Sequence, residues 1–159
     1  MKAIIQRVKY ATVKVDDEIK GSVNQGFLVL LGVEKGDLDE DCQLLAKKVA
    51  NLRIFTDEND KMNKSLLDVD GEALVISNFT LCANNRKGNR PSFDDAMPPF
   101  EANAMYEDFC ENLKNEGVKV VQKGVFGAHM AVELLNDGPI TITLDTNIWR
   151  KKCLLKPVL

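Results

Sequence analysis

Two short segments of this sequence combine polar side chains in patterns that suit a binding or catalytic site. The first is residues 77–81, Ser-Asn-Phe-Thr-Leu, where an apolar run ends in hydroxyl and amide groups just before a long loop. Convergent polar groups at the rim of an apolar region are typical of a ligand site. Serine and threonine also end ordinary strands, because their hydroxyls satisfy backbone groups there. Both interpretations stay open on these residues alone.

The second segment is residues 136–141, Asn-Asp-Gly-Pro-Ile-Thr, which lies between two stretches of alternating apolar and polar residues. The Asp-Gly pair predicts a tight turn that joins two strands as a hairpin. Proline is acceptable as the first residue of the second strand. The hairpin leaves open whether the Gly138–Pro139 bond is cis, a form that some X-Pro bonds adopt in folded proteins.

Side chains for nucleophilic or metal chemistry are scarce. His129 is the only histidine, so any nucleophile–histidine pair must use it, and we expect it instead to be packed and hydrogen-bonded. The acidic residues are spread over helix and turn surfaces, which gives weak support to acid–base catalysis by side chains. Cys42, Cys82, Cys110 and Cys153 form no Cys-x-x-Cys pair. We expect them to be small buried side chains, with neither a zinc site nor a disulfide framework.

The composition is that of a globular protein with a single domain over residues 1–159. Hydrophobic residues make up 45% and charged residues 28% of the chain. The longest apolar run, residues 26–33, is too short to cross a bilayer, and the opening residues lack a secretory signal pattern. We therefore expect a cytoplasmic protein. The net charge of -3 argues against extensive binding of nucleic acid, so any RNA contact must be local.

The first half of the chain predicts several strands and one helix. Residues 1–8, 11–15 and 19–23 have strand patterns, and residues 27–31 are apolar on both faces, as in a central strand. Asp37 is the expected N-cap of an amphipathic helix, whose core face recurs at helical spacing over residues 38–52. A short strand over 53–56, a polar excursion over 57–70 and a buried strand over 73–79 follow.

The second half begins with a long loop over residues 82–99, which has no periodicity and is typical of a functional segment. Two prolines at 98–99 favour the start of a second amphipathic helix, and Gly117 favours its end. Residues 118–121, 130–135 and 140–144 are strand-like. The pattern predicts an α+β fold with a mostly antiparallel, barrel-like sheet and two main amphipathic helices.

At the two polar segments the sequence resembles the D-aminoacyl-tRNA deacylase family, also called the D-tyrosyl-tRNA deacylases. The resemblance covers essentially the whole chain and includes residues 1–8, 62–66, 90–93 and 124–130. The family's two signatures are Ser-Gln-x-Thr-Leu and Asn-x-Gly-Pro-x-Thr. The second is intact at residues 136–141, whereas the first carries Asn78 in place of the usual glutamine, a side chain one methylene shorter.

The resemblance implies a homodimeric esterase without cofactor or metal, which removes a D-amino acid from the 3′-terminal ribose of a charged tRNA. Glycine, for example mischarged on tRNA-Ala, is an implied second substrate. The family inserts its Gly-Pro dipeptide, with a cis bond, into the active site of the partner chain. Carried over, the pocket floor is Ser77, Asn78, Phe79 and Thr80, the chiral filter is Gly138 and Pro139 braced by Arg7, and the adenosine seat is Phe126, Met130 and Ala102.

Such a site selects by shape, because a rigid main-chain wall clashes with an L side chain and leaves a D side chain in solvent. Attack by water on the activated ester then needs placement and an oxyanion site, for which backbone N–H groups near Phe79 and Thr80 are candidates. The 2′-hydroxyl of the tRNA ribose is a plausible aid to that water. A competing mechanism makes Thr80 the nucleophile, although the sequence offers no base beside it.

Candidate phosphate contacts are Arg86, Lys87 and Arg90 in the long loop, with three further cations at residues 150–152. Alternatively, these side chains form a solvated surface. Two other functions remain open beside the deacylase. One is a catalytically silent nucleic-acid-binding module of the same fold, which Asn78 favours, and the other is hydrolysis of a small ester without RNA.

Overall fold

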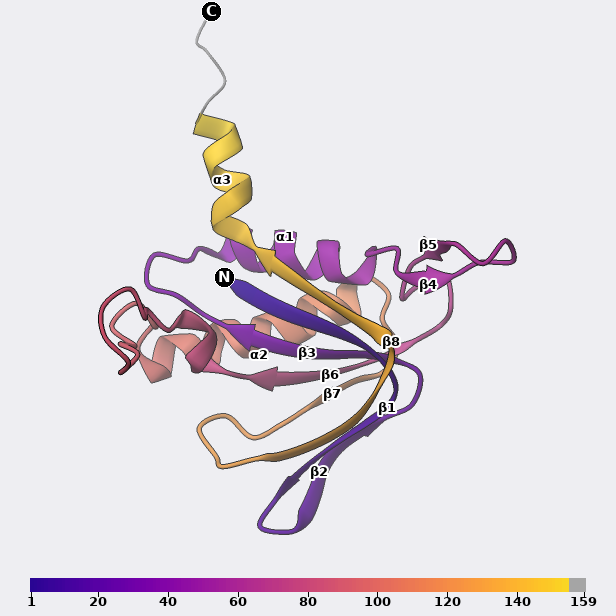
Figure 1. Cartoon of the computed structure of the whole chain (residues 1–159), viewed down its shortest axis with the longest axis horizontal. Helices are drawn as coiled ribbons and strands as arrows, with labels where there is room; N and C mark the ends of the chain where they lie inside the picture. Colours follow the sequence, from indigo (N-terminus) through magenta and orange to yellow (C-terminus); the bar gives the residue numbers. More distant parts are fainter. Residues whose placement is uncertain (155–159) are drawn as a thin grey trace, which may run out of the picture.

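The fold consists of a curved sheet with two long helices packed on it and a C-terminal helix that projects from the end of the last strand (Figure 1). The computed structural model describes the backbone of residues 1–154 and the side chains of residues 1–150. The elements follow in the order β1 (Lys2–Val15), β2 (Glu18–Val23), β3 (Gly26–Gly32), α1 (Asp39–Ala50), β4 (Phe55–Thr56), β5 (Met62–Lys64), β6 (Glu72–Ser77), the 3₁₀ helix η1 (Phe79–Cys82), α2 (Pro99–Asn115), β7 (Val121–Lys123), β8 (Ala131–Asp145) and α3 (Thr146–Leu154).

The main sheet is mostly antiparallel and nearly closed. Its strands are ordered β2-β1-β3-β6-β7, and β8 pairs with β1 outside this path. The pairs of β1 with β2, β3 and β8 are antiparallel, whereas β6 is parallel to both β3 and β7. The sheet curls until β2 approaches β7, since a Cβ atom at Gly21 would lie 2.8 Å from the Lys123 carbonyl oxygen. The predicted α+β fold with a barrel-like sheet is confirmed.

The predicted central strand is β3, which lies between β1 and β6 and is buried on both faces. Because side chains alternate along a strand, Val29 and Leu31 face one core and Leu28 faces the other. The first core packs the sheet against α1 and α2, and the second fills the inside of the curled sheet. The predicted core face of the second helix is confirmed, with residues 102, 105, 109 and 113 buried.

The largest departure from the predicted strands is in β8. Residues 131–145 form one continuous strand along β1, so the predicted Asp-Gly hairpin is wrong. The register runs from Gln6 opposite Thr141 to Val8 opposite Asn136. Residues 137–140 therefore face a single residue of β1, Arg7, and leave the ladder as a large bulge. An Asp-Gly pair with positive φ at the glycine suits either a hairpin or a bulge, and here the long partner strand selects the bulge.

Smaller departures occur at element ends. Helix α1 has Leu38 rather than Asp37 as its N-cap, and the Leu38 N–H donates to Asp41 Oδ2 at 2.7 Å. The strand predicted to reach Phe79 ends at Ser77, because the chain turns there into η1. Helix α3 follows β8 directly, although no helix was expected after residue 117. None of the helices within residues 1–154 combines the length and apolar character needed to span a membrane.

Three of the cysteines are buried and unpaired, as predicted: Cys42, Cys82 and Cys110. Burial raises the pKa of the Cys42 thiol to about 11 and that of Cys110 to about 12, so both stay protonated at neutral pH. A protonated thiol is a poor nucleophile. The side chain of Cys153 lies outside the described residues.

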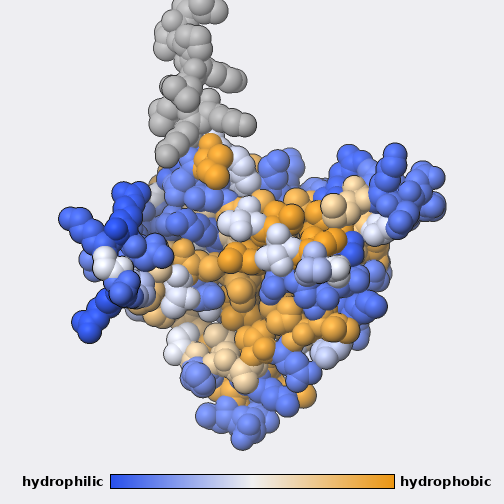
Figure 2. Space-filling view, in the orientation of Figure 1, coloured by the Kyte–Doolittle hydropathy of each residue, from blue (hydrophilic) through white to orange (hydrophobic). Residues whose placement is uncertain are grey.

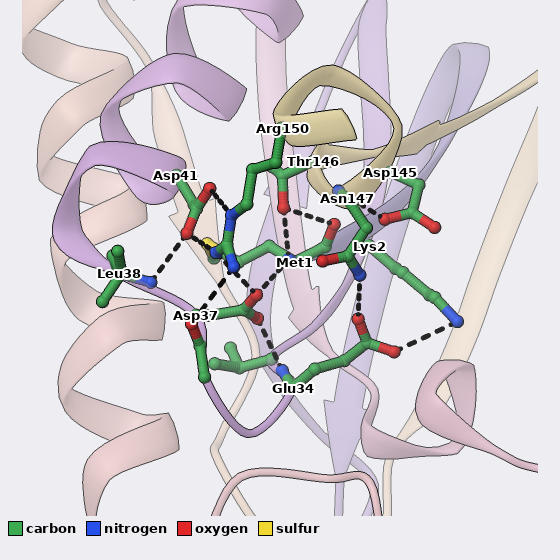
Figure 3. Close-up of polar contacts among 12 residues, drawn as sticks. Met1, Lys2, Glu34, Asp37, Leu38, Asp41, Asp145, Thr146, Asn147 and Arg150 are labelled. Carbon is green, nitrogen blue, oxygen red and sulfur yellow. Dashed lines mark hydrogen bonds and ion pairs between the residues drawn. The ribbon is translucent and has the colours of Figure 1, made fainter. Parts of the chain in front are cut away.

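A network of buried charges joins the start of β1, the entry to α1 and the beginning of α3 (Figure 3). The α-ammonium of Met1 donates to Asp37 Oδ1 and to Thr146 Oγ1, both at 2.6 Å. The other Asp37 oxygen accepts the Glu34 N–H at 2.6 Å. The Arg150 guanidinium lies 3.5 Å from Asp37 and forms an ion pair with Asp41. Asp37 was predicted to be the N-cap of α1, but its carboxylate lies at the centre of this network instead.

Removal of the central carboxylate gives a test of this network. Asp37→Ala is expected to lower the free energy of unfolding by about 3 to 5 kcal/mol, because it leaves a buried ammonium without its partner. Urea unfolding at pH 7 measures the loss. The control is Asp39→Ala, which removes an exposed carboxylate from the first turn of the same helix and should cost less than about 1 kcal/mol. Equal losses in the two variants would contradict the role assigned to Asp37.

Candidate active site

One cavity of about 770 Å³ lies where β6 ends, between η1, the start of α2 and the loop before β8. Seven of the residues predicted for the site line it together: Ser77, Asn78, Phe79, Thr80, Ala102, Phe126 and Met130. They come from three stretches of chain that are far apart in sequence. The structure therefore brings together the residues expected for the pocket floor and for the adenosine seat.

The register of the sheet sets the position of the pocket floor. Ser77 is paired with Leu31 of β3, and the Asn78 N–H donates to the Leu31 carbonyl oxygen at 2.8 Å. The chain then turns into η1 close to Gly32, where an added Cβ atom would lie 2.9 Å from Cβ of Leu81. The absence of a side chain at residue 32 thus lets η1 approach the end of β3.

The first N–H groups of η1 have no acceptor within the helix, as at any helix N-terminus. Asn78 precedes η1 as its N-cap, but its side chain makes no capping hydrogen bond. Instead the Thr80 hydroxyl donates to Asn78 Oδ1. The Asn78 side chain therefore accepts the Thr80 hydroxyl proton, and the N–H groups of residues 79 and 80 lie in the first turn of η1.

Aromatic rings form part of the cavity wall. Phe79, which is 57% exposed, meets Phe93 edge to face with ring centroids 5.0 Å apart. Phe126 packs against Tyr106 at a centroid distance of 6.0 Å. The Tyr106 hydroxyl donates to the Val75 carbonyl oxygen at 2.8 Å, and burial raises the pKa of this phenol so that it remains a donor. Tyr106 was not predicted, although its helical spacing from Ala102 and Phe109 marks it as a core position.

His129 also lines this cavity and is exposed. The expectation that it is packed and hydrogen-bonded is wrong. The reason is the segment before β8, which turns at Gly127 with φ +77° and leaves residue 129 outside the strand ladder. A single imidazole therefore stands in the same cavity as the Thr80 hydroxyl.

Gly138 and Pro139 do not line the cavity. Both are exposed at the tip of the β8 bulge, and the peptide bond between them is cis. Arg7 holds the base of the bulge: its Nε donates to the Asp137 carbonyl oxygen at 3.0 Å and its Nη1 to the Ile54 carbonyl oxygen at 2.7 Å. The Ile140 N–H donates to Asn136 Oδ1 at 2.9 Å. Side chains from β1 and β8 thus fix a bulge that takes no part in lining its own cavity.

The cations predicted to contact phosphate are in different environments. Arg86, Lys87 and Arg90 are exposed in the loop before Ser92, and none of them lines the cavity. Arg150 belongs to the buried network with Asp37 and Asp41, so the structure argues against its use as a phosphate contact. The side chains of residues 151 and 152 lie outside the described residues.

Comparisons with known proteins agree with this arrangement. Proteins named D-aminoacyl-tRNA deacylase from Roseiflexus sp. (strain RS-1) and Thermosipho africanus (strain TCF52B) are 52% and 53% identical to this chain. The matches cover 95% and 92% of this chain and 97% of each relative. A solved structure described as c-Myc DNA Unwinding Element Binding Protein is 41% identical with a TM-score of 0.86, and the match covers 91% of this chain and 98% of that one.

The relatives are named as deacylases, which are hydrolases that act on aminoacyl-tRNA. The family model described as D-Tyr-tRNA(Tyr) deacylase matches residues 4–145. The chain belongs to this family, as the two signature segments predict.

The hold of Arg7 on the bulge can be tested. Arg7→Met leaves the carbonyl groups of Ile54 and Asp137 without their donor and should cost about 1 to 3 kcal/mol in urea unfolding. Hydrogen exchange of the Ile140 amide should accelerate at the same time, because the bulge loosens. Lys9→Met, at an exposed position of the same strand, is the control and should change neither quantity. Unchanged exchange at Ile140 in the Arg7 variant would contradict the assignment.

Proposed function

We propose that this protein hydrolyses the ester bond of D-aminoacyl-tRNA and releases the free D-amino acid and tRNA. The observation that carries the proposal is the single cavity that unites residues 77–80 with Ala102, Phe126 and Met130 in a member of this family. The cavity has apolar and aromatic walls for an adenosine and a polar floor for the ester. Such a protein acts in the cytoplasm, where it recycles mischarged tRNA as a step of translation quality control.

The chiral filter is Gly138–Pro139 from the partner chain of a homodimer. Three observations support this arrangement: the bulge is exposed, Arg7 braces it, and it is not part of its own cavity. A further observation supports a partner on this side: Figure 2 has apolar side chains across the face where β8 lies in Figure 1. Ile142 and Leu144 of β8 are only partly buried there. A twofold pair of chains would cover this face and complete two sites.

Selection follows from a main-chain wall that cannot move aside. An L side chain would collide with the wall, whereas a D side chain points to solvent and is not examined further. One pocket therefore accepts many D-amino acids. Glycine has no side chain to exclude, so glycyl-tRNA, including glycine mischarged on tRNA-Ala, is a second substrate.

Hydrolysis needs a placed water and stabilisation of the developing oxyanion. The backbone N–H groups of Phe79 and Thr80 at the start of η1 supply the oxyanion site, and each such donor is worth on the order of 10²- to 10³-fold in rate. The 2′-hydroxyl of the terminal ribose orients the water. Thr80 lines the pocket in this mechanism, and its hydroxyl proton is engaged by Asn78.

A second candidate function is a nucleic-acid-binding module without catalysis. Two observations favour it: the 41% identical protein is described as a DNA-binding one, and Asn78 replaces the family's glutamine. Incubation with D-Tyr-tRNA and L-Tyr-tRNA separates the two functions. We expect rapid release of D-tyrosine and spontaneous release of L-tyrosine, whereas a pure binder would leave both esters at the spontaneous rate.

The role of Thr80 is tested separately. Thr80→Ala should keep most of the deacylation rate, because the main chain and the ribose carry the reaction. A loss on the order of 10⁴-fold would instead identify Thr80 as the nucleophile. His129→Ala is measured in parallel, since His129 is the histidine of the same cavity and the candidate base for that nucleophile. A nucleophile–base pair predicts a large loss in both variants, and the water mechanism predicts a small one in both.

A further inference from the structure

A second concave surface gathers positive charge away from the cavity described above. The C-terminal half of α1 and the residues after it form a shallow groove of about 470 Å³, lined by Leu44, Lys47, Lys48, Asn51, Leu52 and Arg53. We call this surface the α1 groove. Its lining contains three cations and no acid, in a chain whose net charge is -3. A local excess of cations on an acidic protein is the footprint of a binding surface for phosphate groups.

Two of these cations, Lys48 and Arg53, have neutral neighbours that position their side chains. The Lys48 ammonium lies 5.7 Å from the centre of the Trp149 ring. Arg53 Nε donates to the Asn63 carbonyl oxygen at 2.8 Å, which fixes its side chain with a neutral partner. Among the side chains of residues 1–150, Lys47 and Lys48 take part in no ion pair. Other lysines of the chain do form ion pairs; Lys114, for example, pairs with Glu111.

The α1 groove adjoins the bulge that carries Gly138 and Pro139. The guanidinium of Arg7 contacts the carbonyl of Ile54, the residue after Arg53, and also that of Asp137, the residue before Gly138. One side chain therefore spans the distance between the end of the groove and the base of the bulge. In Figure 1 the end of α1 lies on the side of the molecule where the middle of β8 passes.

The position of the α1 groove beside the bulge matters for the proposed function, on which the following inference rests. A bulge that enters the partner's cavity carries the α1 groove with it to the rim of that cavity. The RNA whose 3′ end occupies the cavity must leave across the same rim. We propose that the α1 groove of one subunit binds the phosphate backbone of the RNA whose aminoacyl end lies in the partner's cavity.

The rival explanation is local: lysines in the last turn of a helix are favourable beside its C-terminal carbonyl groups. Lys47 and Lys48 would then contribute to stability and not to RNA binding. The two explanations differ in what the substrate must contain. Phosphate binding affects a substrate with an RNA strand, whereas helix stabilisation acts equally on every substrate.

The experiment compares D-Tyr-tRNA with 3′-O-(D-tyrosyl)adenosine, which has the reacting ester but no phosphate. Lys47→Glu/Lys48→Glu should raise KM for D-Tyr-tRNA by about tenfold or more and leave the adenosine ester unchanged. The slope of log(kcat/KM) against log salt should become shallower by about two, one for each lost phosphate contact. The control, Lys114→Glu/Lys119→Glu, makes the same change of charge at exposed lysines elsewhere and should retain the wild-type slope.

Each result decides a separate point. An unchanged KM for D-Tyr-tRNA, or an equal loss on both substrates, would overturn the role of the α1 groove. If Lys47→Glu/Lys48→Glu does not fold to a dimer, Lys47→Gln/Lys48→Gln repeats the comparison with a smaller change of charge. If the unaltered protein hydrolyses neither ester, the proposed function fails. Filter binding of uncharged tRNA to the same proteins then tests the groove independently, and equal affinities would refute it.

Discussion

The pairing of β8 with β1 is the constraint on which the site depends. β8 follows β1 from Lys2 opposite Asp145 to Lys14 opposite Ala131, yet it carries four residues where β1 has only Arg7. The surplus residues must leave the ladder, and their carbonyl groups must find donors near the strand. Arg7 meets this need with a buried guanidinium that reaches the bulge on one side and Ile54 on the other. A loop held in this way presents Gly138 and Pro139 with little freedom to retreat.

The same strand also fixes the cavity. β1 pairs with β3, β3 pairs with β6, and the last pair of that ladder places Ser77 beside Leu31. The pocket floor and the bulge therefore follow from one sheet, the floor from the end of β6 and the bulge from β8. Gly138 and Pro139 of the bulge do not line the cavity of their own chain. In the proposed homodimer a second copy would supply the missing wall without any change inside the subunit, which is the physical reason that a site shared between subunits suits this fold.

The sequence predicted the elements that depend on hydrophobic periodicity, and it missed the features that depend on contacts between residues far apart in the chain. Helix α2 was predicted because its apolar residues recur at helical spacing between Pro99 and Gly117, and the structure buries that face. The bulge was read as a hairpin, since an Asp-Gly pair has the same local pattern in both and only the length of β1 distinguishes them. The helical spacing of Tyr106 indicates only a core residue, whereas the structure shows that its hydroxyl donates to the Val75 carbonyl oxygen. His129 is exposed because the chain turns at Gly127, and hydrophobic periodicity does not predict this turn.

The distribution of charge is compatible with the proposed action of this acidic protein on RNA. Several cations are used internally: the Met1 ammonium on Asp37, Arg150 on Asp41, and Lys2 on Glu34, 3.1 Å away. Charges neutralised in this way contribute little to the field that a polyanion feels. The exposed cations outside such pairs include those of the loop around Arg86 and those of the α1 groove. Under the proposed function, recognition rests on the position of the cations rather than on net charge, which suits hydrolysis at one end of a tRNA.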